Sequence, residues 1–280
     1  MDKDQYLHLL RSEFGYQTPP GQRVSGNYFP GWLNSIYYLR LISTLIHAGI
    51  VGRRGGLDDD KWAWFSHRIL QIVESVGGKV NISGLEALSR QPGPLVYIAN
   101  HMSLLETLIL PGIALAFNRV TFVIKEELRH YPVIKHIFLS LKLIAVSRQN
   151  PRDDLKMVMR EGSEFIADGG SIIIFPQSTR SVEFDVEGFN TLGIKLAARN
   201  GVPVVPVAIK TDFQHNGKWI KDMGPIDPQK TLYFKFGEPL PVEGKGRKTH
   251  QQVIEFIAQN LLAWGGSIKE KAEFGPVVVR

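Results

Sequence analysis

The sequence of 280 residues contains no cysteine. This absence excludes a disulfide framework, a zinc site built from thiolates and a catalytic thiol. The sequence also lacks a dense lysine- or arginine-rich tract, zinc-finger spacing and an aromatic RNA-binding signature, so no nucleic-acid partner is expected. Its eight histidines form no ligand-spaced pair with carboxylates. We therefore expect neither a metal site nor a bound cofactor.

The N-terminus begins with Met1, Asp2, Lys3 and Asp4 and lacks a basic region that leads into an apolar run. A secretory signal peptide is therefore not expected, and a cytoplasmic location is predicted. The formal net charge of +6 favours anionic partners such as phospholipid headgroups or an acidic carrier protein. Hydrophobic residues make up 44% of the chain, enough for a substantial core. The length fits one large domain, or one domain with a helical extension.

The first long apolar run covers residues 28–51 and predicts a helix. Its polar positions recur at helical spacing and form one narrow stripe: Arg40, Ser43, Thr44 and His47. A spanning segment has about 20 nearly uncharged residues, so the charge at Arg40 favours a helix lying in the membrane interface. A buried core helix stays open as the alternative, since periodicity does not distinguish lipid from protein as the apolar partner.

A second helix is predicted over residues 60–76, after the helix-breaking glycines at Gly52, Gly55 and Gly56. It carries Trp62 and Trp64, which suit a membrane interface or the seam between two helices. We therefore interpret residues 1–78 as an N-terminal helical region that associates with a membrane. Residues 79–280 are interpreted as an α/β domain.

From residue 79 onward, short apolar runs alternate with helical patterns, which is typical of an α/β fold with a largely parallel sheet flanked by helices. Strands are predicted at 94–99, 120–125, 143–147, 171–176, 202–209 and 231–236. Helices are predicted at 104–117, 153–167, 189–199 and 249–264. The loose segments are expected at 243–248 and after residue 265.

The chemical centre is predicted where residues 95–99, an apolar strand, deliver Asn100 and His101 to the carboxyl end of the sheet. Glu106 follows five residues after His101, a spacing that keeps the two apart on one continuous helix. With Ser103 as the N-cap, Glu106 falls in the first helical turn and His101 stays free to fold back towards it.

Such a pair can perform general-base catalysis. A neutral imidazole takes the proton of an alcohol, and a carboxylate on its other nitrogen fixes the tautomer and stabilises the imidazolium. The alternative stays open that Ser103 and Glu106 form a simple capping box and His101 is a satisfied turn residue.

Three further segments join this one in a pattern that resembles the lysophosphatidic acid acyltransferase family, the 1-acyl-glycerol-3-phosphate acyltransferases, over roughly residues 77–210. The first block is Asn100, His101, Met102, Ser103, Leu104, Leu105 and Glu106, with Glu where the family has Asp. The second comprises residues 122–128 and 143–148, with Lys135 and Lys142 where glycines are usual. The third is Phe175, Pro176, Gln177, Ser178, Thr179, Arg180 and Ser181, with Gln and Ser replacing Glu and Gly. The fourth is the apolar strand at 202–207.

The resemblance implies that a fatty acyl group moves from a thioester, on coenzyme A or acyl carrier protein, to the hydroxyl of a lysophospholipid. His101 acts as the base and Glu106 orients it. Substrate binding falls to Arg148 and Arg180, with Lys125 as a further candidate, and to the turn of Gln177, Ser178 and Thr179. A guanidinium suits the phosphate of the acceptor.

A tetrahedral oxyanion also needs donors, and we expect them among the backbone N–H groups of residues 101–104. The enzyme is expected at the cytoplasmic face of an anionic membrane, as a peripheral or monotopic protein. Two alternatives stay open: a lipid-binding protein without catalysis, and an enzyme that passes the acyl group to water or to another alcohol or lysolipid.

Overall fold

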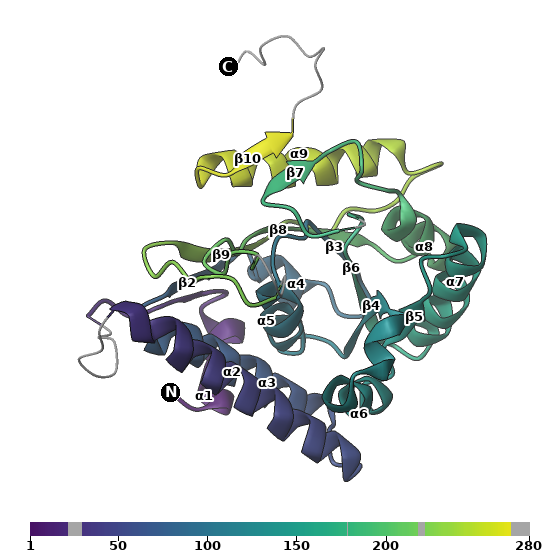
Figure 1. Cartoon of the computed structure of the whole chain (residues 1–280). Coiled ribbons are helices and arrows are strands. Elements are labelled where there is room, and N and C mark those ends of the chain that lie inside the picture. Colours follow the sequence, from purple (N-terminus) through teal and green to yellow (C-terminus); the bar gives the residue numbers. More distant parts are fainter. Residues whose placement is uncertain (22–29, 178, 218–221, 270–280) are drawn as a thin grey trace.

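The structure is a computed structural model that describes residues 1–21, 30–177, 179–217 and 222–269. An eight-stranded sheet lies at its centre, and helices cover both of its faces (Figure 1). Its strands, in spatial order, are β1 (Tyr16–Gln17), β2 (Lys79–Ser83), β9 (Thr231–Phe236), β8 (Val204–Lys210), β3 (Val96–Ala99), β6 (Ser171–Ile174), β4 (Val120–Lys125) and β5 (Ile144–Val146). A separate parallel pair joins β7 (Glu183–Asp185) to β10 (Ser267–Lys269).

The pairing of the central sheet is parallel from β8 through β3, β6 and β4 to β5, and also between β2 and β9. Antiparallel pairing joins β1 to β2 and β8 to β9. The predicted α/β fold with a largely parallel sheet is therefore confirmed. The carboxyl ends of β8, β3, β6, β4 and β5 consequently meet at one edge of the sheet, where α/β proteins place their reactive groups.

Helices connect and cover these strands. They are α1 (Lys3–Ser12), α2 (Pro30–Arg53), α3 (Asp59–Ser75), α4 (Glu86–Arg90), α5 (Leu105–Ala114), the 3₁₀ helix η1 (Glu126–His130), α6 (Pro132–Ser140), α7 (Pro151–Ala167), α8 (Leu192–Asn200) and α9 (Arg247–Ala263). Figure 1 shows α2 and α3 side by side on one side of the sheet and α9 on the other. Residues 247 and 248, the end of the segment expected to be loose, belong to α9, and β10 lies where a loose tail was expected after residue 265.

The core has two layers because successive strand residues point to opposite faces of a sheet. In β3, Tyr97 and Ala99 join the cluster shared with α1, α2, α3 and α5, whereas Val96 and Ile98 join the cluster shared with α7, α8 and α9. The first cluster also takes in residues of the N-terminal helices. The predicted boundary at residue 78 stays a prediction, since one continuous core spans both sides of it.

Helix α2 has a buried and an exposed face. Tyr37, Leu41 and Ala48 are buried, whereas Leu39 is 72% exposed and Ile46 is 44% exposed. By length and composition, the segment Trp32–Arg53 is long and apolar enough to cross a membrane. Of its most apolar 18-residue stretch, 28% is buried in the protein. The interpretation as a core helix describes the buried face, and the interpretation as an interfacial helix describes the exposed face. The exposed apolar face indicates membrane association.

Candidate active site

The sequence-predicted site residues gather at the carboxyl edge of the sheet. Strand β3 lies between β6 and β8, with Ile98 opposite Ile174 and Ala99 opposite Val207. The segments that follow β3, β6 and β8 therefore begin close together at the carboxyl ends of these strands. The backbone N–H of Ser181 donates to the carbonyl oxygen of His101 at 3.0 Å, which holds the segment after β6 against the turn after β3.

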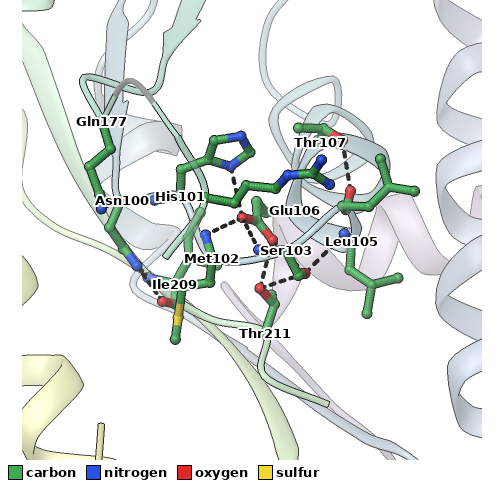
Figure 2. Close-up of polar contacts among 12 residues, drawn as sticks. Asn100, His101, Met102, Ser103, Leu105, Glu106, Thr107, Gln177, Ile209 and Thr211 are labelled. Atoms are coloured by element: carbon green, nitrogen blue, oxygen red, sulfur yellow. Dashed lines mark hydrogen bonds and ion pairs between the residues drawn. The ribbon is translucent and has the colours of Figure 1, made fainter. Parts of the chain in front are cut away.

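The structure brings His101 and Glu106 together, with Nδ1 of the imidazole 2.9 Å from Oε1 of the carboxylate (Figure 2). Glu106 is completely buried, and its two oxygens face five donors. Oε1 accepts from Nδ1 of His101 and from the backbone N–H groups of Met102 at 2.5 Å and Ser103 at 2.7 Å. Oε2 accepts from the hydroxyls of Ser103 at 2.8 Å and Thr211 at 2.6 Å.

The start of α5 explains how Glu106 reaches so many partners. The prediction that Ser103 is the N-cap was wrong: the helix begins at Leu105 with Leu104 as its cap residue, and the Ser103 hydroxyl accepts from the N–H of Leu105 at 3.1 Å. Glu106 lies in the first turn, where the helix dipole stabilises a negative charge. Glu106 accepts the Ser103 N–H, which is half of a capping box, and also contacts His101, so the local helix start does not by itself account for Glu106.

Burial by itself raises the pKa of Glu106, but the hydrogen bond and the electrostatic attraction of His101, the hydroxyl of Thr211 and the local backbone outweigh this effect. The net result is a pKa below the usual range of a glutamate. Glu106 is therefore an ionised, buried carboxylate at neutral pH. Its contacts supply the compensation that a buried charge needs.

The tautomer of His101 follows from this partner. An ionised carboxylate can only accept, so Nδ1 carries a proton and Nε2 is the nitrogen with a lone pair. Figure 2 shows the other ring nitrogen of His101 pointing away from Glu106. The ring stacks on Phe175, with centroids 4.6 Å apart at 25°, and its side chain is 14% exposed. The imidazole is thus held on two sides, and the nitrogen that can act as a base points away from Glu106.

The backbone N–H groups expected to stabilise an oxyanion are already engaged. His101 donates to Oε1 of Gln177 at 2.9 Å, while Met102 and Ser103 donate to Glu106. The expectation that this turn supplies the oxyanion donors is therefore wrong for residues 101–103. These N–H groups instead fix the imidazole and the carboxylate relative to each other.

Gln177 was predicted to bind substrate, but the structure gives it a different contact. Its side chain is buried, and its carbonyl oxygen accepts the N–H of His101. Gln177 therefore ties the segment after β6 to the histidine turn. Thr179, two residues further on, is exposed. Ser178, which was also predicted to bind substrate, lies outside the described residues.

Arg180 forms an ion pair with Asp222. The Asp222 carbonyl oxygen accepts from Nε2 of Gln214 at 2.7 Å, and Gln214 also contacts the hydroxyls of Tyr37 at 3.2 Å and Tyr38 at 3.3 Å on α2. The guanidinium that the sequence assigned to phosphate is therefore occupied by a carboxylate. An anionic ligand at Arg180 must displace or share Asp222.

Lys125 and Arg148 leave the same edge of the sheet further from His101. Lys125 ends β4, and its ammonium lies 2.5 Å from the carboxylate of Glu127. Arg148 follows the edge strand β5, is exposed and has a φ of 59°, and its N–H donates to Asp154 at 2.7 Å. Because β5 is three strands from β3, its axis lies about 14 Å away. Of the two, Lys125 is placed closer to the dyad.

Sequence reasoning missed Thr211 and the contacts of Asn100. Thr211 directly follows β8, and its hydroxyl reaches Glu106 from a strand 105 residues away in the chain. The Asn100 side chain donates to the Ile209 carbonyl at 2.7 Å and accepts the Ile209 N–H at 2.8 Å. A polar residue at the end of a wholly buried strand was the available signal for Thr211. Within the described residues, no group of three or more His, Asp or Glu side chains could hold a metal ion.

A family model described as Acyltransferase matches residues 79–210, which span β2 to the end of β8 and contain both members of the dyad. Residues 79–210 therefore resemble the acyltransferase family. The acyltransferase resemblance seen in the four sequence blocks is thereby confirmed.

Individual relatives agree. The chain is 28% identical over 220 residues to a 1-acyl-sn-glycerol-3-phosphate acyltransferase of Pseudomonas aeruginosa, covering 78% of each protein. It is 30% identical over 149 residues to a chloroplastic 1-acyl-sn-glycerol-3-phosphate acyltransferase of Arabidopsis thaliana, covering 52% of this chain and 41% of that protein. The crystal structure of a Thermotoga maritima 1-acyl-sn-glycerophosphate acyltransferase matches with a TM-score of 0.58 at 23% identity, over 88% of this chain and 98% of that one. This last likeness supports the fold.

Proposed function

We propose that this acyltransferase is a glycerophospholipid O-acyltransferase that transfers a fatty acyl group from a thioester to the hydroxyl of 1-acyl-glycerol-3-phosphate, giving phosphatidic acid. The observation that carries the proposal is the 2.9 Å contact between Nδ1 of His101 and the buried carboxylate of Glu106. The names of the relatives from Pseudomonas aeruginosa and Arabidopsis thaliana support the choice of acceptor.

In this reaction the Nε2 nitrogen of His101 removes the proton of the acceptor hydroxyl as the oxygen attacks the thioester carbonyl. The carbon–oxygen bond forms, and a tetrahedral intermediate carries the negative charge on the former carbonyl oxygen. Collapse of the intermediate breaks the carbon–sulfur bond, and the imidazolium returns its proton to the departing thiolate. Glu106 stabilises the imidazolium between these steps. Positioned general-base catalysis contributes about 10²- to 10⁴-fold.

The phosphate of the acceptor is proposed to bind at Arg180, whose segment is tied to the His101 turn through Ser181 and Gln177. Lys125, at the end of β4, adds a second cation on the same edge of the sheet. Thr179 is exposed beside Arg180 and offers a hydroxyl. Arg148 remains a more distant candidate. A bidentate guanidinium and an ammonium together suit a phosphomonoester.

The acyl donor is proposed to be acyl coenzyme A or acyl carrier protein, used as a co-substrate. The acceptor is a membrane lipid, so the protein is expected at the cytoplasmic face as a peripheral or monotopic protein. The exposed apolar side chains of α2 support attachment, and the net charge of +6 supports an anionic membrane surface.

The test is mass-spectrometric identification of products after purified protein is incubated with mixed lysolipids and each donor type. Phosphatidic acid is expected as the product, and free fatty acid alone would contradict the proposed acceptor. The variant His101→Ala should lose transfer while keeping its fold. His250→Ala is a matched control, because His250 also stacks on a phenylalanine, Phe189, but lies on α9. A folded His101→Ala protein with the wild-type rate eliminates the mechanism.

A further inference from the structure

Thr211 lies at the back of the dyad, on the side of Glu106 that His101 does not touch. It is completely buried, and its hydroxyl lies 2.6 Å from Oε2 of Glu106 and 2.9 Å from the hydroxyl of Ser103 (Figure 2). The start of α5 is already bonded without Thr211, because Glu106 accepts the Ser103 N–H and the Ser103 hydroxyl accepts the Leu105 N–H. The contact with Thr211 therefore goes beyond what the local helix start requires.

The fold delivers this hydroxyl through a specific connection between strands. Strand β8 pairs in parallel with β3 up to Val207 opposite Ala99. Beyond that pair, the Asn100 side chain bonds both the N–H and the carbonyl oxygen of Ile209. This two-bond clamp continues the pairing past the end of β3. Thr211 follows two residues later, beneath the first turn of α5.

The two oxygens of the Glu106 carboxylate have different partners. Oε1 meets Nδ1 of His101 and two backbone N–H groups, whereas Oε2 meets the hydroxyls of Ser103 and Thr211. Glutamate has one more rotatable bond than the aspartate usual in the family, and each free torsion weakens positioning. A donor from another strand removes that freedom, because rotation of the carboxylate would break the bond to Thr211.

Resting on the proposed function, we propose that Thr211 is a positioning residue of the acyl transfer, which holds Oε2 of Glu106 so that Oε1 stays directed at Nδ1 of His101. The charged groups beside it belong to a separate cluster: Asp212 pairs with Lys210 at 2.8 Å and with Lys230 at 2.9 Å. From the end of β8, Thr211 contacts Glu106, and from the turn between β3 and α5, His101 and Ser103 contact it.

The experiment compares Thr211→Val, which keeps the shape and removes the hydroxyl, with Thr211→Ser, which keeps the hydroxyl. Both are made in the full chain and assayed with 1-acyl-glycerol-3-phosphate and an acyl thioester. We expect Thr211→Val to lower kcat by about 10- to 100-fold, the effect of misplacing a catalytic group by about 1 Å. The KM of the acceptor should change less than kcat. Thr211→Ser should restore most of the rate.

The pH profile gives a readout that a purely structural role would not change. The Thr211 hydrogen bond lowers the pKa of Glu106, so its loss raises that pKa, and the ratio of the Thr211→Val rate to the wild-type rate should fall as the pH is lowered. Thr249→Val is the matched control, since Thr249 is also buried and bonds the Pro241 carbonyl at 3.0 Å away from the dyad. It should leave kcat and the profile unchanged.

A folded Thr211→Val protein with the wild-type kcat and profile overturns the inference, as does an equal loss in Thr211→Ser or Thr249→Val. If the wild type itself transfers no acyl group, the proposed function fails instead. ¹⁵N NMR of the histidine side chains then still tests the inference. The wild type should show the Nδ1–H tautomer of His101, Thr211→Val should show a mixture of tautomers, and identical spectra refute the role of Thr211.

Discussion

Replacing Glu106 by glutamine separates the charge of the dyad from its shape. The carboxamide oxygen can take the place of Oε1 and accept from His101 and from the N–H groups of Met102 and Ser103. The new NH₂ group then faces the hydroxyls of Ser103 and Thr211, which can turn to accept hydrogen bonds. The fold should therefore survive, while the negative charge beside the imidazole is lost.

The expected loss in kcat for Glu106→Gln is about 10³- to 10⁴-fold, because the imidazolium loses its counter-charge and the tautomer is no longer enforced. Stability should fall by no more than about 3 kcal/mol, since the charge-assisted hydrogen bonds become neutral ones. The pKa of Glu106 is depressed on folding, so its ionisation stabilises the protein above the unfolded pKa, and this contribution is lost as pH falls through the folded pKa. The difference in Tm between wild type and variant should therefore shrink in acid.

The assay is steady-state acyl transfer with circular dichroism and thermal unfolding on the same samples. Glu106→Asp is the matched variant: it keeps the charge but withdraws the carboxylate by about 1.5 Å, one carbon–carbon bond. It cannot then reach Thr211 and His101 together, and an intermediate kcat is expected. A folded Glu106→Gln protein that keeps more than a tenth of the wild-type kcat refutes the role of the charge.

Three further outcomes follow from particular contacts. Asp222→Asn should lower the KM of the phosphate-bearing acceptor several-fold in steady-state assays, because the carboxylate that competes for the Arg180 guanidinium is removed. An unchanged KM would argue against phosphate binding by Arg180. Joint substitution of the exposed Leu39 and Ile46 by serine should weaken co-sedimentation with anionic liposomes without lowering Tm, and undiminished binding argues against α2 as the attachment face. Gly112→Ala should lower the free energy of unfolding by about 1–3 kcal/mol in denaturant titration, because the new Cβ overlaps the Cβ of Ser66 where α5 packs on α3. A variant with wild-type stability would show that the two helices can separate at low cost.

The strands of the sheet were predictable because they are short, apolar runs bounded by turn residues. The predicted segments 120–125 and 231–236 coincide with β4 and β9. Strands without such a run were missed. β2 alternates buried positions with exposed or half-buried ones, and β7 and β10 pair only with each other. Helix α1 was also missed, although its capping box of Asp2 and Gln5 is visible in the sequence.

The site was predictable as far as its contacts are local. His101 and Glu106 are five residues apart, so strand, turn and helix signals sufficed to place them together. The remaining contacts join distant segments: Gln177 reaches His101 across 76 residues, and Thr211 reaches Glu106 across 105. Such pairs depend on strand order, which periodicity does not determine. For the same reason, the ion pair of Arg180 with Asp222 had no local signal.

The departures of this chain from the family's usual residues are accommodated by these distant contacts. Gln177 offers the His101 N–H an uncharged acceptor where a glutamate would bring a second carboxylate close to Glu106. Lys142 stands where a glycine is usual and has a φ of 49°. The residue therefore adopts the left-handed conformation that suits glycine, at some cost in backbone strain. The longer Glu106 is held from behind by Thr211. The chain thus preserves the orientation of the imidazole while changing the residues that secure it, which is why orientation, rather than residue identity, is the property that the experiments should probe.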